Sequence, residues 1–257
     1  MLYAPEHVFA CVSSVYFCAN QREFIRSMKR LFQIIAVLVF SPISLVNAAG
    51  EGQPYYGGID VFATRSELVS EKDLIATTTF LLEGRGTLED QRRLTFDDAG
   101  HGKRIYMGVS SAPDWDWEWG YIDFGKTHGR YEGDSSSSTL DMKTDVKAEG
   151  WFLHFQYSPK ITDSLEWNLK LGILRWDGSR YSRMTMTDPV KNPVELYETI
   201  SGIDEYFGTG LLYTVNERWK IRFDANRYML ADDQMDTFGI AAQFWFSGRL
   251  INNIFDY

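Results

Sequence analysis

Histidine and carboxylate side chains are the groups of this 257-residue chain that could perform acid–base chemistry or bind a metal ion. Three histidines, His101, His128 and His154, lie beyond the N-terminal region, and no serine or acidic residue can be assigned to any of them at catalytic spacing. Carboxylates cluster at 97–98 and 232–236, where we interpret them as solvated loop acids rather than a calcium site. Neither a phosphate-binding glycine loop nor a zinc-spaced set of cysteines and histidines is present. The sequence therefore predicts no catalytic residue, no cofactor and no metal site.

A single apolar segment, residues 31–46, has the flanks of an export signal and is too short for a membrane helix. It follows basic residues, is interrupted by Pro42 and is followed by small residues. We predict that residues 28–49 are a signal peptide that is removed on export. Residues 1–27 are then an upstream extension outside the fold, either because Met28 is the true initiator or because the signal has an unusually long leading region.

Charge, hydropathy and cysteine content narrow the class of protein. The formal net charge is −9 at pH 7 and no long cluster of lysine and arginine is present, so nucleic acid is excluded as a partner. The mean hydropathy of −0.27 excludes a protein with several membrane helices. Both cysteines, Cys11 and Cys18, lie in the upstream extension, so the exported chain forms no disulfide. Export without disulfides indicates a bacterial envelope.

Beyond residue 50, apolar residues recur at every second position, which is the period of a β-strand with two different faces. The segments 115–121, 165–173 and 219–225 show this most clearly, because bulky apolar residues alternate there with charged residues, asparagine or glycine. We predict eight strands, at about 55–65, 103–111, 115–126, 149–158, 164–176, 205–215, 218–229 and 236–246.

The predicted connections alternate in length along the chain. Short turns are expected at 112–114, 159–163 and 215–217, and long loops at 66–102, 127–148 and 177–204, with a shorter connection at 230–235. Short turns at one end of a sheet and long loops at the other are typical of transmembrane barrels of the outer membrane. The polar, low-complexity segment 133–139 is expected to be a mobile loop.

The apolar strand face is predicted to meet lipid. Aromatic residues make up 15% of the chain, and all eight tryptophans lie in predicted strands, as in the aromatic belts of membrane barrels. The opposite face mixes glycine with charges of both signs, which suits a narrow barrel interior; the alternative is a soluble barrel with an aromatic core. Four residues near strand ends break the alternation: Trp176 and Trp245 fall on the inner face, and Arg175 and Arg227 on the outer. The residues predicted to face lipid are Trp117, Trp119, Trp167, Leu169, Leu171, Ile221 and Phe223.

Three segments resemble the transmembrane domain of the OmpA family of outer membrane proteins. Residues 102–126 are similar to that family's second and third strands, residues 150–177 to its fourth and fifth, and residues 206–246 to its last three. The resemblance implies an all-β fold, an eight-stranded antiparallel up-and-down transmembrane β-barrel over 50–246, followed by a short tail at 247–257.

The same resemblance implies a lumen closed by charged residues, and matching of positions assigns Glu118, Lys170 and Arg222 to this interior cluster. The family's acidic position on the sixth strand is Leu212 here, and its basic position on the fourth is His154 or Gln156. We therefore expect a smaller network than in the family.

Three functional classes follow, in order of preference: a structural or surface-interaction barrel that works through its loops, a narrow pore, and a lipid-modifying enzyme. An eight-stranded barrel is only wide enough to be filled by its own side chains, so the first is preferred and enzymatic activity is not expected. The expected location is the outer membrane. The expected partners are outer membrane lipid and lipopolysaccharide, and a barrel-assembly machinery that reads Phe246 or Tyr257, with the protein itself a monomer.

Overall fold

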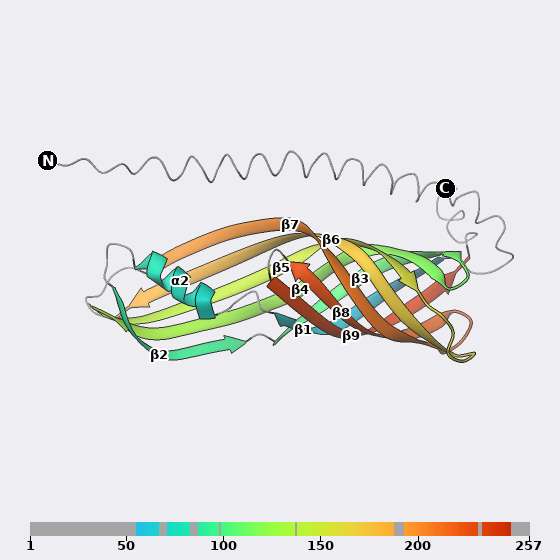
Figure 1. Cartoon of the computed structure of the whole chain (residues 1–257), viewed down its shortest axis with the longest axis horizontal. Coiled ribbons are helices and arrows are strands. Elements are labelled where there is room, and N and C mark those ends of the chain that lie inside the picture. The colour runs from blue at the N-terminus through green and yellow to red at the C-terminus, as the bar shows by residue number, and fades with distance from the viewer. Residues whose placement is uncertain are drawn as a thin grey trace, which may run out of the picture. The chain divides into compact units, whose positions relative to one another are not determined.

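The computed structural model describes residues 55–66, 71–82, 87–97, 99–136, 138–187, 193–230 and 233–247, all within the compact unit Gly52–Tyr257 (Figure 1). The predicted upstream extension, the signal peptide and the tail beyond Ser247 lie outside these residues. No helix in the described part of the chain is long and apolar enough to cross a membrane. The elements are β1 (Tyr55–Ser66), α2 (Glu71–Leu81), β2 (Leu88–Asp97), β3 (Ala99–Ala112), β4 (Trp115–Ser135), β5 (Thr139–Tyr157), β6 (Leu165–Met186), β7 (Val194–Thr214), β8 (Trp219–Leu230) and β9 (Asp233–Phe246).

Eight of these strands close into an antiparallel barrel. Each strand from β3 to β9 pairs with the next, and the ring closes because β1 pairs with both β3 and β9. The closing register runs from Tyr55 opposite Phe246 to Ser66 opposite Met235. The predicted all-β, eight-stranded antiparallel barrel is therefore confirmed.

The strands of the barrel differ in length. β1, β3, β8 and β9 have 12–14 residues, whereas β4, β5, β6 and β7 have 19–22. A tilted strand needs about 9–11 residues to cross the hydrocarbon layer. The four long strands therefore continue past the barrel wall as a sheet, and β2 adds to β4 at its edge. We call this sheet, beyond Lys126, Lys147, Gly178 and Glu205, together with α2 and β2, the extension.

The extension corrects the prediction of long loops. Of the segments predicted as loops, 127–135, 139–148, 177–186 and 194–204 are paired strands, and 66–102 contains α2 and β2. Figure 1 shows α2 and β2 beside the far ends of the long strands. In these segments the residues facing out are polar because they meet water, and a polar outer face was interpreted as a loop.

A β-bulge in β4 marks the start of the extension. Gly125 has φ of 80°, in the left-handed region that glycine favours, and its N–H donates to Asp123 Oδ1 at 3.0 Å. One extra residue is accommodated on β4 between Asp123 and Lys126 relative to β5. Because of this residue, the inward face of β4 changes from even positions such as Phe124 to odd positions such as Thr127.

The extension has its own apolar core on the face that continues the barrel interior. Leu74 and Leu81 of α2 are buried there, as are Leu140, Met142 and Met184 of the sheet. The Thr78 hydroxyl lies 2.7 Å from the Leu74 carbonyl oxygen and 3.2 Å from Met142 Sδ, which fixes the helix against β5. α2 thus covers one face of a sheet that would otherwise expose these residues.

The predicted mobile loop at 133–139 is also corrected. Gly133 and Ser135 are buried residues of β4, and Thr139 begins β5. The Ser135 N–H donates to the Ser138 carbonyl at 2.8 Å, and the Ser136 N–H to the Thr87 carbonyl at 3.0 Å. These polar residues form the tight turn of a long hairpin, because serine can satisfy turn backbone groups.

Candidate functional site

The outer wall of the barrel is an apolar surface. Every residue predicted to face lipid points outward: Trp119, Trp167, Leu169, Leu171 and Phe223 are exposed, and Trp117 and Ile221 are half-buried on the same face. Ile59, Ile105, Phe207, Phe238 and Ile240 add to this surface. A closed sheet leaves no unpaired edge in hydrocarbon, so this wall can cross a bilayer. The chain is a β-barrel of the outer membrane type.

Aromatic residues gather at both ends of this wall. At the short-turn end Trp115 stacks on Phe155 at 4.5 Å and packs against Tyr157 at 4.4 Å. Towards the extension, Tyr121 meets Trp151 edge to face at 5.3 Å. Such rings suit the two interfaces of a membrane, where apolar and polar surroundings meet. The extension lies beyond the second of these rings, on the side that carries the longer segments.

The interior holds the three predicted charges in one network. Glu118 and Arg222 form a two-bonded ion pair, with Arg222 Nη1 2.6 Å from Glu118 Oε2 and Nη2 3.2 Å from Oε1. Lys170 does not contact Glu118 directly. Its Nζ lies 2.5 Å from Asp224 Oδ2, which is also 2.8 Å from Arg222 Nε in a second ion pair. Arg222 and Asp224 therefore link Lys170 to Glu118.

The network is larger than predicted, because three further charges join it. Arg104 Nη2 lies 2.5 Å from Asp60 Oδ2 and 2.7 Å from Asp224 Oδ2, and all three side chains are buried. The interior network thus joins six charged residues rather than the three assigned from the sequence. Alternation alone places these residues on the inner face, so the signal was present, but matching to family positions singled out only three charges. Three acids and three bases balance here, which offsets the cost of burying them.

His154 belongs to this interior and is buried. Its Nδ1 lies 2.5 Å from the Tyr206 hydroxyl, and its Nε2 lies 3.5 Å from Glu118 Oε1. Neighbouring Gln156 hydrogen-bonds Ser158 at 2.8 Å. His154, one of the two candidates for the family's basic position on the fourth strand, is thus packed among the side chains that fill the lumen.

Aromatic rings fill the lumen above and below the charges. Tyr106 lies beneath the Arg222 guanidinium, 4.4 Å from it, and Tyr206 stacks on Tyr228 at 4.6 Å. Trp245 packs on Tyr56 at 4.5 Å, so this tryptophan faces inward as its position predicted. Small residues make room for the rings: the ideal Cβ position of Gly108 lies 2.1 Å from the Tyr56 ring. Few open paths can remain in so narrow a barrel.

The other residues that break the alternation sit as their positions predicted. Trp176 is buried on the inner face and donates from Nε1 to Asp204 Oδ2 at 2.6 Å. Arg175 is exposed, and Arg227 pairs with Asp236 at 2.7 Å on the outer face. Both arginines lie near the junction with the extension, where charged groups reach water.

The outer face of the extension is polar and carries several ion pairs. Arg130 forms two bonds to Asp141, both 2.9 Å, and His128 Nδ1 lies 2.7 Å from Asp145 Oδ1. The Asp141 carboxylate raises the pKa of the Arg130 guanidinium above its usual range. A face of this kind belongs in water rather than lipid.

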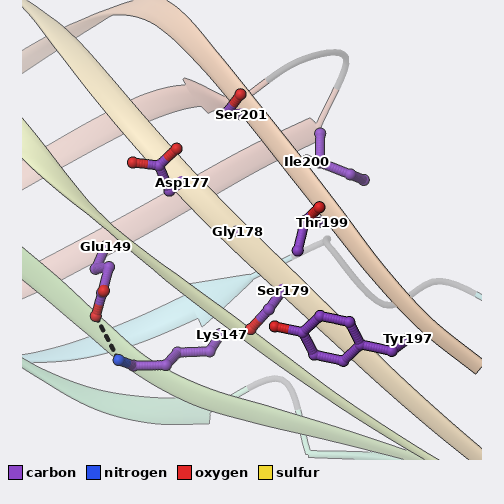
Figure 2. A pocket seen from close by; sticks show the side chains of 9 residues that line it. All are labelled: Lys147, Glu149, Asp177, Gly178, Ser179, Tyr197, Thr199, Ile200 and Ser201. Carbon is purple, nitrogen blue, oxygen red and sulfur yellow. Dashed lines mark hydrogen bonds and ion pairs between the residues drawn. The ribbon is translucent and has the colours of Figure 1, made fainter.

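A hollow of about 350 Å³ opens on this face near the junction with the barrel (Figure 2). Its walls come from three adjacent strands: the Lys147–Glu149 ion pair on β5, Asp177 and Ser179 on β6, and Tyr197 with the hydroxyl residues of β7. Short side chains form the middle of the hollow, and Gly178 has none. Sequence reasoning missed the hollow because it depends on segments of three strands that were interpreted as loops.

Metal ligands do not gather in the described residues. Those residues contain no group of three or more histidine, cysteine and acidic side chains placed to hold a metal ion. Of the carboxylates singled out in the sequence, Asp98 and Asp232 lie outside the described residues. His101 is exposed on β3, at the edge of the apolar wall.

No protein-family model matches the chain, and no curated protein matches it. Solved structures similar to it include Ail, the attachment invasion locus protein of Yersinia pestis, with 14% identity over 75% of this chain and 99% of Ail, at a TM-score of 0.39. Outer membrane protein OprG from Pseudomonas aeruginosa shows 13% identity over 76% of this chain and 98% of OprG, at a TM-score of 0.42. Neisserial surface protein A shows 11% identity over 75% and 96%, at 0.36.

The strand pairing decides the fold independently of these likenesses. The chain is a small eight-stranded antiparallel β-barrel of the outer membrane type. The fold that the resemblance implied is confirmed.

Proposed function

We propose that this outer membrane barrel is a surface-interaction protein, in which a closed barrel anchors an extracellular sheet that contacts partners. The observation that carries the proposal is the continuation of β4, β5, β6 and β7 for about ten residues beyond the length a bilayer requires. About ten residues of strand span roughly 30 Å. A sheet of this size, packed against its own helix, is a rigid platform for recognition.

The filled interior supports an anchoring role over a pore. Glu118, Arg222 and Asp224 are linked across the lumen by ion pairs of 2.6 and 2.8 Å. Opening a water column would separate charges that compensate one another, at a cost of several kcal/mol. We therefore propose that the barrel does not conduct solutes.

The placement of two of the three described histidines, His128 and His154, supports a non-enzymatic role over lipid modification; the third, His101, is exposed at the edge of the apolar wall. His154 is enclosed by Tyr206 and Phe152, and His128 is bound to Asp145 on the water-facing sheet. Acyl transfer needs a nucleophile beside a base at the membrane edge. Neither of these two histidines occupies such a position.

Partners and processing follow from the same proposal. Outer membrane lipid and lipopolysaccharide would surround the apolar wall, and cleavage near residue 49 would release the exported chain. Phe246, which ends β9 and lies opposite Tyr55, is the terminal aromatic we propose for recognition by the assembly machinery. A barrel with a closed lumen and a complete apolar wall can function as a monomer.

A trimmed barrel tests the proposal. Residues 128–145 and 180–198 can be removed between register partners, Thr127 opposite Val146 and Ser179 opposite Thr199, and replaced by Asn-Gly turns. A short linker from Ser66 to Ala99 replaces α2 and β2. We expect the trimmed and full-length proteins both to migrate as heat-modifiable barrels and both to be non-conducting in planar bilayers.

Three results would contradict the proposal. A large, steady conductance of the full-length protein would favour the pore. Release or transfer of an acyl chain from lipid A, detected by mass spectrometry, would favour the enzyme. Failure of the trimmed protein to fold would show that the extension belongs to the anchor.

A further inference from the structure

The β7 strand has an unpaired edge in the extension. β6 pairs with β7 from Val194 to Tyr213, but β8 pairs with it only from Tyr206 to Thr214. Among the described residues, Val194–Glu205 therefore has a ladder partner on one side only. About half of the backbone N–H and C=O groups of this segment point to the open side, where a further strand can bind them.

This edge lacks proline and lysine, two of the features that commonly block strand addition. Between residues 194 and 205 there is no proline, lysine or arginine. Tyr197 and Ile200 are exposed, on opposite faces of the strand. An added strand would find apolar side chains on both faces as well as backbone groups at the edge.

The hollow on the outer face lies beside this edge (Figure 2). Asp177 on β6 is opposite Ser201 on β7, and Ser179 is opposite Thr199. Strands lie about 4.7–4.9 Å apart, so a strand added to β7 runs roughly 10 Å from β6. A long side chain opposite Ser201 can pass over that short residue and bring a cationic group to Asp177.

The charges of the region select the partner. Glu195, Glu198, Asp204 and Glu205 stand on β7 itself, where they are nearest to an added strand. The arginines of β6 lie one strand further in: Arg183 is 3.7 Å from Glu195, and Arg180 is 4.0 Å from Glu198. Directly opposed positions prefer opposite charges, so the favoured neighbour is basic.

A second copy of the chain fits this edge poorly. Antiparallel pairing of two β7 edges would set a segment with four acids and no base against itself. Like charges in opposed positions destabilise a sheet. The acids on β7 thus discourage self-association while leaving the edge open to a basic strand.

We infer that the β7 edge binds an extended basic peptide segment by strand addition, with one arginine or lysine of the segment reaching Asp177 in the hollow. The inference rests on the proposed surface role and names the class of partner for it. Backbone bonds along β7 supply binding without regard to sequence, and the hollow supplies preference for a cationic side chain.

A labelled peptide tests this inference on the full-length protein in lipid nanodiscs. The probe is a twelve-residue peptide that alternates arginine with valine or threonine, and binding is followed by fluorescence anisotropy. We expect saturable binding, at least tenfold weaker binding of the glutamate counterpart, and at least tenfold weaker binding of a version with proline in place of valine and threonine. The proline peptide keeps the charge but cannot form a regular strand.

Matched variants locate the site. Asp177→Asn should weaken binding about threefold to tenfold, as expected for a lost charge-assisted contact. Glu89→Gln, which removes a carboxylate from the opposite edge strand β2, should leave binding unchanged. Heat-modifiable migration confirms that each variant is folded.

Four results would overturn the inference: no saturable binding up to about 1 mM peptide, equal binding of the proline peptide, equal loss from the two carboxylate variants, or a dimer in solution whose dissociation is required for peptide binding. Each can occur with a non-conducting, lipid-inactive barrel, so failure here is distinct from failure of the proposed surface role.

Discussion

The barrel and the extension are built from the same strands, but their apolar residues lie on opposite faces, outward in the barrel and inward in the extension. Along β5, the barrel segment points Trp151 outward and His154 inward, whereas the extension segment points Lys143 outward and Met142 inward. The two-residue period continues through both segments. What changes at the junction is the surrounding medium, lipid around one part and water around the other.

This inversion explains why the two regions are stabilised differently. In the barrel, the apolar outer face contacts lipid, and the charged side chains of the inner face form ion pairs with one another. In the extension, the polar outer face contacts water. The helix α2 covers the inner face, with Leu74 and Leu81 buried against the sheet. Substitutions that are severe in one region should therefore be mild in the other.

The largest difference is expected between buried and exposed ion pairs. Glu118→Ala leaves the buried Arg222 without its two-bonded partner and should lower the free energy of unfolding by about 3–5 kcal/mol. Asp141→Ala breaks the exposed pair with Arg130 and should cost about 0–1 kcal/mol. Equilibrium unfolding in urea, followed by tryptophan fluorescence in lipid vesicles, measures both. Equal losses would show that the lumen is hydrated.

A second comparison places arginine at two positions on the outer face of β6, one in the barrel and one in the extension. Leu169→Arg in the barrel part of β6 should cost about 2–4 kcal/mol if the site lies near the midplane of the bilayer. Tyr181→Arg lies on the same face twelve positions along the chain and should cost only about 0.5 kcal/mol, because its surroundings are aqueous. The same unfolding measurement applies. A similar cost at both positions would contradict the position assigned to the bilayer.

Removing a core side chain of α2 should affect the extension alone. Leu74→Ala should reduce the stability of the extension by about 2–3 kcal/mol, since it leaves a space against the sheet. Hydrogen exchange should then speed up at β5 residues 140–146 and stay slow at 150–156 in the barrel. Faster exchange in both segments would show that the two regions unfold as one unit.

The smallest effect is expected at the bulge between the regions. Gly125→Ala places a residue with a side chain in the left-handed conformation, at a cost of about 1–2 kcal/mol. The added Cβ would also lie 2.2 Å from the His101 carbonyl oxygen. Gly129→Ala, on β4 beyond the bulge, is the control for a glycine without a positive φ. Thermal unfolding by circular dichroism compares them. An unchanged midpoint in Gly125→Ala would show that the bulge is not strained by a side chain.

The barrel could be predicted from the sequence because its outer face is so apolar. Residues such as Trp117, Trp119 and Leu171 reveal the alternation at once, and the inward charges follow by parity. Asp60, Arg104 and Asp224 could have been found in the same way. They were missed because family positions, rather than parity, chose the interior charges.

The extension could be predicted only in part. Leu140, Met142 and Val146 alternate with charged residues on β5, and this pattern alone would have indicated a strand. On β4 the bulge at Gly125 changes the parity, so the pattern is broken where the extension begins. The hollow beside β7 could not be predicted, because it forms only once three strands are placed side by side.

Labelling of single cysteines on intact cells tests the central claim most directly. With Cys11 and Cys18 replaced by serine, Lys143→Cys stands on the outer face of the extension and Leu171→Cys on the apolar wall of the barrel. The account predicts that a membrane-impermeant maleimide labels Lys143→Cys on intact cells and labels Leu171→Cys only after denaturation. Labelling of Lys143→Cys only in broken cells, or of Leu171→Cys on intact cells, would contradict it.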